Sequence, residues 1–439
     1  MVRNGGRLLV ECLISLGATK SFGVPGESYL AVLDALHDTR GKLDYVLCRN
    51  EGGAAFMASA YGKLTGTPGI SFVTRGPGVT NASIGVHTAM QDSSPMILFV
   101  GQVGTDMKGR EAFQEIDYRA VYGTVAKWAV EIDDVDRLPE IVARAWTTAL
   151  TGRPGPVVVA LPEDMLTAMT GAAPLGGPAS VFEAAPAQEA IASVLKMLAA
   201  AENPVLLMGG TNWTADGRAA LQAFAEASDI PVVTAFRYQD QFDNHSPVFV
   251  GEAGVGMVPH VKNLIRDADV ILAVNVRFGE MTTDGYTLLE VPVPRQKLIH
   301  VHGSDREIGK IYVPTVGIHA GPNAFAKALI PIKGSWADWR TTARKAYEGT
   351  FAAPVQPARS TWSRSAPGCA RRCRPTSSSP TAPAISPCGR TSSSSLDRKR
   401  ACLRRNPAPW AMACRPRSRP RSHTRNAPWS ALPVTAISR

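Results

Sequence analysis

The sequence has little cysteine and no recognisable metal-binding cluster. Seven cysteines occur in 439 residues, and only Cys12 and Cys48 lie in the first 360. No C-x-x-C pair occurs, and the closest two cysteines, Cys369 and Cys373, have no histidine near them. A structural metal site is therefore not expected. Two scattered thiols in the first 360 residues fit a reducing compartment, so we predict a cytoplasmic protein.

Long apolar runs are also missing. No stretch reaches the roughly 20 apolar residues that a membrane-spanning helix requires. The opening segment, MVRNGGRLLVECLISLGA, has Glu11 inside its apolar run and no cleavage-site pattern. It predicts an amphipathic helix rather than a signal peptide, and we expect no membrane partner.

The net charge of +10 is distributed unevenly. Residues 361–439 contain fifteen Arg and one Lys against a single Asp, a net charge of +15, which leaves −5 for the first 360 residues. Only this tail could contact phosphate backbones. Its arginines lack regular interleaving with glycine or aromatic residues, so we expect no nucleic acid partner. A non-catalytic, nucleic-acid-binding or scaffold protein that uses the tail stays as the alternative function.

Apolar patterns with strand and helix spacing alternate through most of the chain. In the first part the expected strands are 21–24, 45–48, 70–73, 96–100 and 157–161, and the expected helices between them include 27–36, 51–64, 77–90 and 138–150. In the second part the expected strands are 205–208, 232–234, 270–274 and 298–301, with helices at 218–227 and 260–267. Short, continuous apolar strands between helices predict parallel sheets that are covered on both faces.

The sequence thus predicts an α/β fold with two consecutive doubly wound parallel-sheet domains, at residues 1–171 and 189–350. An Ala-, Gly- and Pro-rich linker at 172–188 separates them. From residue 357 the composition changes to Ser, Arg, Pro, Ala and Cys, and no periodicity continues. We expect residues 357–439 to be a disordered basic tail.

Glycine-rich turns follow three of the strands expected in the first domain. They are GVPGE at 23–27, RNEGG at 49–53 and TRGPG at 74–78. Each alone is an ordinary strand-to-helix turn, and Glu51 alone is an acidic residue favoured by the helix dipole. Together they would converge at one edge of the sheet, where doubly wound folds bind ligands. A carboxylate in such an apolar crevice can exchange protons near neutral pH.

Longer segments carry a specific resemblance. The order GVPGESYLAVLDAL, RNEGGAAFMASAYGKLTGTPG, FVTRGPGVTNASIGVHTAMQDSSPMILFVGQV, EAFQEID and TGRPGPVVVALPEDM resembles the pyrimidine-binding (PYR) domain of the acetolactate synthase family of thiamine-diphosphate-dependent enzymes. Further on, NPVLLMGG, DADVILAVNVRFGE and QKLIHVHGSDREIGK are similar to the central domain of that family. Residues 277–282 depart from its flavin-binding pattern, which makes bound FAD doubtful.

The resemblance implies roles for nine residues. Glu51 matches the glutamate that hydrogen-bonds the aminopyrimidine ring of thiamine diphosphate and activates the cofactor. The matching cofactor-binding positions are Pro25, Gly26, Gly76, Asn81 and Gln91, and the matching substrate-channel positions are Phe113, Gln114 and Lys127. The implied substrate is a 2-keto acid, and the implied assembly is a homo-oligomer with the active site between subunits. The AFQE and GQV segments favour an acetolactate-synthase-like carboligase, although glyoxylate carboligase, oxalyl-CoA decarboxylase and benzoylformate decarboxylase share the scaffold.

The third domain of the family has no counterpart in the sequence as written. That domain holds the diphosphate through Mg²⁺ with a Gly-Asp-Gly motif followed by Asn, and this chain contains no Gly-Asp-Gly. Codons compatible with three tail segments, read one base earlier, give family-like peptides in the right order. Residues 380–385 become TNGAGN, residues 409–413 become SMGYG, and residues 432–439 become FAGDGDFQ. We interpret the tail as a frameshift product that begins near Ala358, and we expect the chain as written to be inactive or nearly so.

Overall fold

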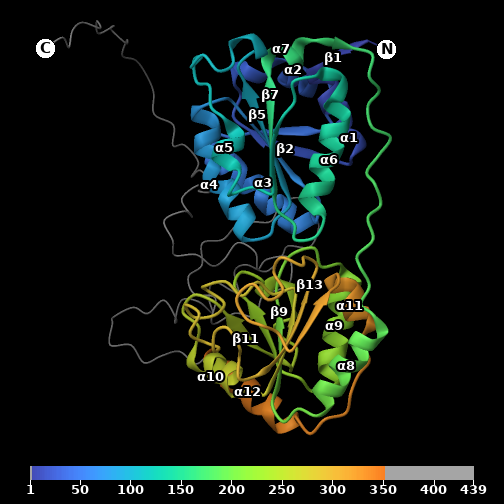
Figure 1. The fold of residues 1–439 in the computed structure, drawn as a ribbon, viewed down its shortest axis with the longest axis vertical. Coiled ribbons are helices and arrows are strands. Elements are labelled where there is room, and N and C mark those ends of the chain that lie inside the picture. The colour runs from blue at the N-terminus through green and yellow to red at the C-terminus, as the bar shows by residue number, and fades with distance from the viewer. Residues whose placement is uncertain (1, 352–439) are drawn as a thin grey trace, which may run out of the picture. The chain divides into compact units, whose positions relative to one another are not determined.

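The computed structural model describes residues 2–351, which contain two α/β units (Figure 1). Each unit is built on a six-stranded parallel sheet, and a short antiparallel pair joins β1 (Arg3–Asn4) to β8 (Met169–Thr170). The prediction of two consecutive doubly wound parallel sheets is therefore confirmed. The predicted disordered tail at 357–439 and its frameshift lie outside the described residues.

The first sheet has the strand order β3-β2-β4-β5-β7-β6. Its strands are β2 (Lys20–Gly23), β3 (Asp44–Leu47), β4 (Gly69–Val73), β5 (Met96–Gln102), β6 (Trp128–Glu131) and β7 (Pro156–Pro162). Every residue of the central strands β4, β5 and β7 is buried, as their continuous apolar sequences predict. The expectation of a buried strand at 45–48 is wrong, because β3 is an edge strand with partly exposed residues.

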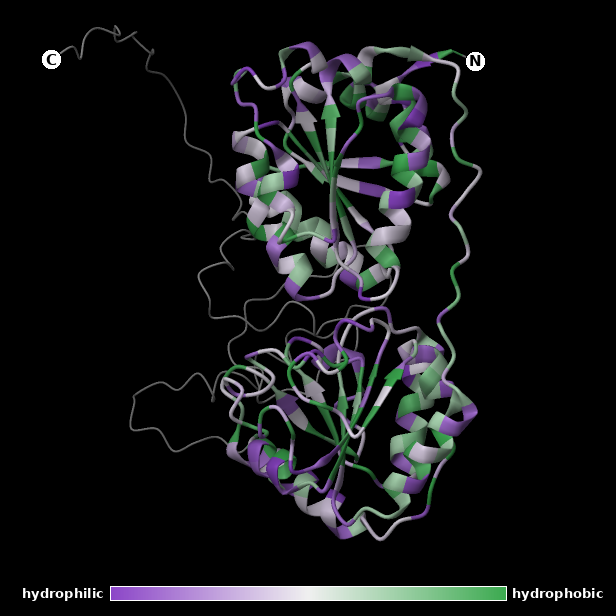
Figure 2. Ribbon diagram, in the orientation of Figure 1, coloured by the Kyte–Doolittle hydropathy of each residue, from purple (hydrophilic) through white to green (hydrophobic). Residues whose placement is uncertain are grey.

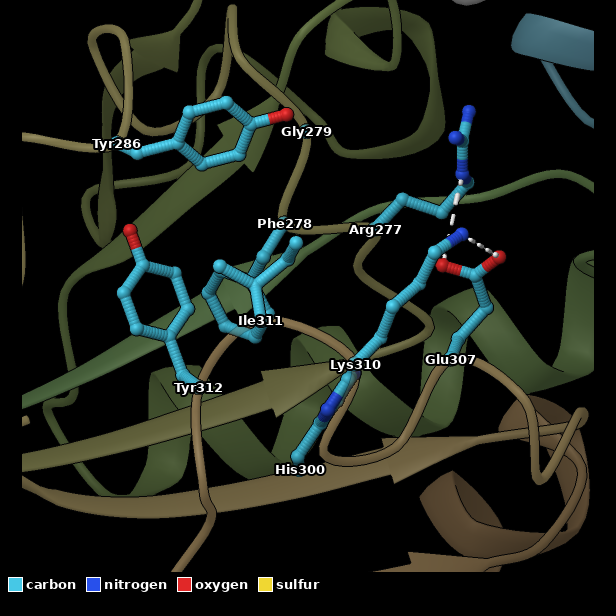
Figure 3. A pocket seen from close by; sticks show the side chains of 9 residues that line it. All are labelled: Arg277, Phe278, Gly279, Tyr286, His300, Glu307, Lys310, Ile311 and Tyr312. Atoms are coloured by element: carbon cyan, nitrogen blue, oxygen red, sulfur yellow. Dashed lines mark hydrogen bonds and ion pairs between the residues drawn. The ribbon is translucent and has the colours of Figure 1, made fainter. Parts of the chain in front are cut away.

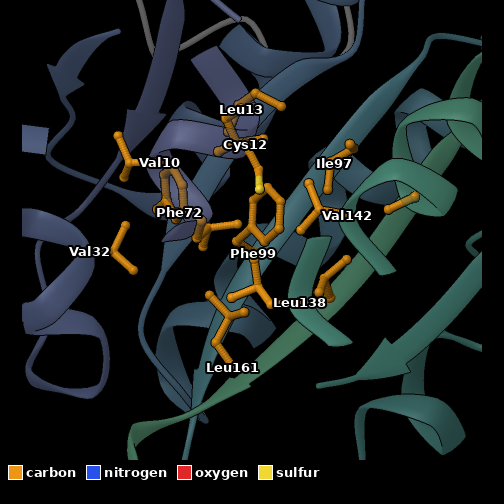
Figure 4. Close-up of a cluster of buried hydrophobic side chains, with 14 of the residues drawn as sticks. Val10, Cys12, Leu13, Val32, Phe72, Ile97, Phe99, Leu138, Val142 and Leu161 are labelled. Atoms are coloured by element: carbon orange, nitrogen blue, oxygen red, sulfur yellow. The ribbon is translucent and has the colours of Figure 1, made fainter. Parts of the chain in front are cut away.

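Helices cover both faces of this sheet. They are α1 (Gly5–Ser15), α2 (Leu30–Asp38), α3 (Glu51–Thr65), α4 (Pro77–Gln91), α5 (Tyr118–Tyr122), α6 (Leu138–Leu150) and α7 (Glu163–Thr167), with 3₁₀ turns η1 (Glu27–Tyr29), η2 (Thr105–Met107) and η3 (Val135–Arg137). Side chains of α1, α2 and α6 form one core with the sheet, in which the rings of Phe72 and Phe99 stack with centroids 5.1 Å apart (Figure 4). Helices α3, α4 and α5 form a second core on the opposite face.

The second sheet has the strand order β11-β10-β9-β12-β13-β14. Its strands are β9 (Pro204–Met208), β10 (Val232–Ala235), β11 (Phe249–Ala253), β12 (Val270–Val274), β13 (Lys297–His302) and β14 (Val316–His319). Its helices are α8 (Gln188–Ala199), α9 (Ala215–Ala227), α10 (Pro259–Asp267), α11 (Pro322–Ala328) and α12 (Ala337–Gly349), with a 3₁₀ turn η4 (Gln239–Gln241). Figure 2 shows both polar and apolar residues on individual helices, as amphipathic helices that cover a sheet require.

Residues 171–187 between the two sheets contain no helix or strand, and the exact domain boundaries stay predictions. Within residues 2–351, none of the helices combines the length and the apolar character needed to cross a bilayer.

The strand order positions the candidate site. In the first sheet the order reverses between β2 and β4, and in the second sheet it reverses between β9 and β12. Ligands of doubly wound sheets bind beyond the carboxyl ends of the strands at such a point. In the first sheet these ends lead into the turns that contain Pro25, Gly26 and Gly76.

Candidate active site

The turns after β2 and β4 lie directly against each other. The hydroxyl groups of Ser28 and Thr74 are 2.9 Å apart, and the Ser28 hydroxyl also accepts a hydrogen bond from the backbone N–H of Arg75 at 3.3 Å. A Cβ placed on Gly26 would lie 2.5 Å from the Cβ of Thr74, so only glycine allows this approach. The predicted convergence of these two turns is therefore present in the structure.

Glu51 begins α3 at the same edge of the sheet. Asn50 caps the helix, because its Oδ1 accepts a hydrogen bond from the N–H of Gly53 at 3.2 Å. The side-chain amide of Asn81, in the second turn of α4, donates to Glu51 Oε2 at 3.1 Å. Helices α3 and α4 pack closely at small residues, since a Cβ on Gly85 would lie 2.4 Å from the Cβ of Ala55. Close helix packing thus brings the predicted Glu51 and Asn81 together.

The second oxygen of Glu51 lies beside a glycine. An added Cβ on Gly78 would be 3.7 Å from Glu51 Oε1, which has no hydrogen-bond partner recorded among the described residues. The carboxylate is half-buried. The sequence predicts a glycine turn at 74–78 but does not indicate that Gly78 lies next to Glu51.

A third loop, residues 109–115, packs on the turn after β4. Gly76 has φ +48°, and a Cβ on it would lie 2.8 Å from the Cβ of Gln114, so Gln114 lies at the predicted site. Glu115 holds this loop by accepting hydrogen bonds from the N–H groups of Gly109 (2.7 Å) and Ala112 (3.0 Å). These bonds, that of Gly109 foremost, lower the pKa of the Glu115 carboxyl. Phe113 at the loop tip is 76% exposed, an unusual position for a large apolar ring.

Two of the predicted site residues, Gln91 and Lys127, do not lie beside Glu51. Gln91 is ten residues after Asn81 in α4, about 15 Å along the helix axis. Lys127 precedes β6 at the amino edge of the sheet, opposite to Glu51, and its amine donates to the carbonyl oxygens of Thr148 and, at 2.7 Å, Thr151. Burial lowers the pKa of Lys127 to about 8, and Arg153 acts in the same direction. Neither side chain is brought to Glu51 within one chain.

A pair of tyrosines supports the turn after β2 and was missed by the sequence reasoning. The Tyr29 hydroxyl donates to the carbonyl oxygen of Val24 and lies 3.2 Å from the Tyr45 hydroxyl. Burial raises the pKa of both phenols, that of Tyr45 to about 12, so both stay neutral at physiological pH. Tyr29 lies in the 3₁₀ turn η1 and Tyr45 in the edge strand β3, so the hydrophobic periodicity of the sequence did not mark either residue.

Arg75 and Gln102 are two further polar residues at this edge. The Arg75 guanidinium pairs with Glu163 at 2.8 Å. Gln102 ends β5, is buried, and donates from Nε2 to the carbonyl oxygen of Ile116 at 3.0 Å. A buried amide at the end of an apolar strand was the signal that could have marked Gln102 beforehand.

The second unit contains a small pocket of about 70 Å³ (Figure 3). Its lining includes Arg277, Phe278, His300, Glu307, Lys310 and Tyr312. Glu307 Oε1 pairs with Arg153 at 3.0 Å and with Lys310 at 3.4 Å, so the charges on one side of the pocket are partly neutralised. Pockets for small-molecule ligands usually measure roughly 300–1,000 Å³, so this pocket is small for such a ligand.

Comparison with known protein families identifies the family to which this chain belongs. Residues 3–121 match the thiamine pyrophosphate enzyme N-terminal TPP binding domain, and residues 191–329 match the thiamine pyrophosphate enzyme central domain. The chain belongs to the thiamine pyrophosphate enzyme family. Of the nine predicted site residues, all except Lys127 fall inside the match to the TPP binding domain.

Similar curated proteins include several acetolactate synthases. The chain is 34% identical over 319 residues to the acetolactate synthase large subunit of Corynebacterium glutamicum, which covers 71% of this chain and 50% of that protein. It is 34% identical over 323 residues to the isozyme 3 large subunit of Escherichia coli (72% and 55%), and 29% identical over 380 residues to the mitochondrial enzyme of Schizosaccharomyces pombe (80% and 56%). The chain spans about half the length of the curated relatives it matches.

The site residues of this family member fit one half of the cofactor. A half-buried carboxylate with one free oxygen, beside glycine turns that allow close approach, suits the nitrogen atoms of a flat aminopyrimidine. Within residues 2–351, no group of three or more His, Cys, Asp or Glu side chains is arranged to hold a metal ion.

Proposed function

We propose that this chain derives from a 2-keto-acid carboligase or decarboxylase of the acetolactate synthase type, with Glu51 as the cofactor-activating residue. The observation that carries the proposal is the contact between Glu51 and Asn81 at the switch point of the first sheet. A carboxylate at that edge, inside the segment matched to a TPP binding domain, is where an aminopyrimidine can be polarised.

In this proposal the chemistry supplied by bound thiamine diphosphate is that of an electron sink for 2-keto acids. Glu51 Oε1 would be the oxygen that holds the proton for the pyrimidine ring, since Oε2 already accepts from Asn81. Pro25, Gly26 and Gly76, in the turns after β2 and β4, would hold the ring. Phe113 and Gln114, on the loop held by Glu115, would meet the substrate.

The positions of Gln91 and Lys127 bear on the assembly. Both lie away from Glu51 in the same chain, so their implied roles require a second subunit to bring them to a site. This requirement agrees with a homo-oligomer whose active site lies between subunits. It also makes the roles of Gln91 and Lys127 the parts of the proposal that depend on assembly.

We further propose that the chain as written is inactive or nearly so. Its Mg²⁺ and diphosphate ligands would be encoded by codons now read in another frame beyond Ala358. Cofactor affinity in this class depends on the anchored diphosphate as well as on the ring. A ring pocket alone would hold the cofactor weakly.

The test is to restore the reading frame. Genomic resequencing across the codon for Ala358 would first establish whether the break is real. A frame-restored chain should then consume pyruvate with thiamine diphosphate and Mg²⁺, and the chain as written should not. Glu51→Gln in the restored chain should lower the rate by about 10²–10⁴-fold. Glu189→Gln, at an equivalent first helical turn in the second unit, is the control and should leave the rate unchanged.

The alternative of a nucleic-acid-binding or scaffold protein rests on the fifteen arginines of residues 361–439. Retention on immobilised RNA or DNA that falls steeply with salt, and that disappears when residues 361–439 are deleted, would favour it. Equal retention of the full and shortened chains would remove it.

A further inference from the structure

The turn after β9 lies where a doubly wound sheet usually receives the pyrophosphate of a dinucleotide. It follows the strand at the switch point of the second sheet and leads into the amino end of α9. Gly209 and Gly210 form the turn, and Gly210 has φ +71°. Such a glycine pair normally leaves room for a phosphate group to approach the backbone.

In this chain the room beside Gly210 is taken by Asn275. Asn275 follows β12, is buried, and donates from Nδ2 to the carbonyl oxygen of Thr211 at 3.0 Å. A Cβ added to Gly210 would lie 2.2 Å from Asn275 Nδ2. The close approach that glycine permits is therefore used by an amide of the protein itself.

The amino end of α9 is occupied as well. Thr214 caps the helix by accepting a hydrogen bond from the N–H of Gly217 at 3.0 Å. Asn323 Oδ1 accepts from the N–H of Thr214 at 2.8 Å, and a Cβ on Gly217 would lie 2.0 Å from that oxygen. The carboxylate of Glu183 holds Asn323 in place through its backbone N–H at 3.0 Å. Two backbone N–H groups at this helix terminus, those of Thr214 and Gly217, therefore already have acceptors inside the protein.

The rest of this edge contacts the segment at the end of α4, residues 91–93. Arg237 pairs with Asp92 at 2.7 Å, and the Tyr238 hydroxyl donates to the carbonyl oxygen of Asp92 at 2.9 Å. The Thr211 hydroxyl donates to the carbonyl oxygen of Ser93, and Arg277 donates to that of Gln91 at 2.5 Å. Three loops of the second sheet thus bind one short segment of the first unit.

We infer that the carboxyl edge of the second sheet is a docking surface for residues 91–93 and does not bind a dinucleotide such as FAD. The pocket of about 70 Å³ beside Arg277 is far below the volume that such a ligand needs. The sequence departs from the flavin-binding pattern at 277–282. The guanidinium of Arg277, the first of these residues, donates to the backbone carbonyl oxygen of Gln91. This inference does not depend on the proposed reaction.

The first test is a titration of the full chain with FAD. Flavin fluorescence and the melting temperature should stay unchanged up to 100-fold molar excess of FAD. Saturable one-to-one binding, or flavin absorbance that co-purifies with the protein, would overturn the inference. Asn275→Ala should lower the melting temperature, because Asn275 is buried and donates to the carbonyl oxygen of Thr211.

The second test addresses docking. A protease site inserted at residues 176–182 of the full chain allows the connection between the two units to be cut. After cleavage the two parts should co-elute in size-exclusion chromatography. Asp92→Asn should make them separate at lower salt, whereas Asp284→Asn, which breaks the ion pair of Lys262 inside the second unit, should not. Immediate separation of the wild-type parts, or equal behaviour of the two variants, would contradict the docking role.

Discussion

Asn81 donates a side-chain hydrogen bond to Glu51 Oε2 at 3.1 Å and joins α4 to the first residue of α3. The bond leaves Oε1 of the same carboxylate beside Gly78, with no hydrogen-bond partner among the described residues. One oxygen is therefore fixed by the protein and the other is available, which is the arrangement that a group needs if it is to hold a proton at a defined position.

Removing the Asn81 amide tests this arrangement. In the frame-restored chain, Asn81→Ala should lower the rate of pyruvate consumption by about 10–100-fold, because a hydrogen bond to a charged group contributes roughly 1.5–3 kcal/mol. Ser83→Ala, on the same helix with its hydroxyl bound only to the carbonyl oxygen of Thr80, should leave the rate within a factor of two. Equal rates for the two variants would show that Asn81 does not position Glu51.

The close approach of the 109–115 loop to Gly76 can be tested by stability. Gly76→Ala places a Cβ at φ +48° and within 2.8 Å of Gln114, so it should lower the free energy of unfolding by about 2–4 kcal/mol. Gly66→Ala is the matched control, since Gly66 has φ +73° and open space around it, and should cost only about 1–2 kcal/mol. Urea unfolding of both variants measures the difference, and equal losses would mean that the loop does not pack on Gly76.

Because Lys127 is buried, we expect its contribution to the free energy of unfolding to change with pH in a defined direction. Burial lowers its pKa to about 8 in the folded protein, below the 10.5 of the unfolded chain, so the unfolded state binds more protons between these values. The stability contributed by Lys127 should therefore rise as the pH increases from about 8 to about 10.5. The difference in free energy of unfolding between wild type and Lys127→Met should grow in favour of wild type over this range.

The control for Lys127 is Lys20→Met, because Lys20 is an exposed lysine paired with Asp44 at 3.3 Å. That variant should not show the gain in favour of wild type that is predicted for Lys127→Met. A difference between wild type and Lys127→Met that does not change with pH would contradict the buried position of the amine.

The Glu115 carboxylate should hold the loop that carries Phe113 in its folded conformation. Its pKa is lowered by the hydrogen bonds from Gly109 and Ala112, so these bonds are fully present above its ordinary pKa and are lost as the pH falls through the lowered value. Glu115→Ala should speed proteolytic cleavage within 105–117 at neutral pH, and acidification should do the same to wild type. Glu140→Ala, an exposed helical control, should be cleaved like wild type.

Much of the site was predictable because it lies in turns whose position follows from the strands. The apolar runs 21–24 and 70–73 placed Gly26 and Gly76 at strand ends, and a parallel sheet brings such ends together. Glu51 was predictable as the first residue of a helix that follows a third strand. The contact between Glu51 and Asn81 was not, since it depends on how closely α3 and α4 pack.

Other features had no local signal. The edge position of β3 is a property of strand order, which the sequence of one strand does not contain. Lys127 lies opposite to Glu51 because it directly precedes β6, whereas Glu51 follows the carboxyl end of β3, and no strand was expected at 128–131. The occupied turn beside Gly210 depends on Asn275, 65 residues away, and only the structure brings the two together.

Calorimetric titration with thiamine diphosphate in the presence of Mg²⁺ tests the central claim most directly. The chain as written should show no binding at micromolar concentrations, while the frame-restored chain and its Glu51→Gln variant should both bind, the variant with a rate of turnover lowered by about 10²–10⁴-fold. Micromolar binding by the chain as written would contradict the account, because its ring-binding edge would then hold the cofactor without the residues that the shifted frame has removed.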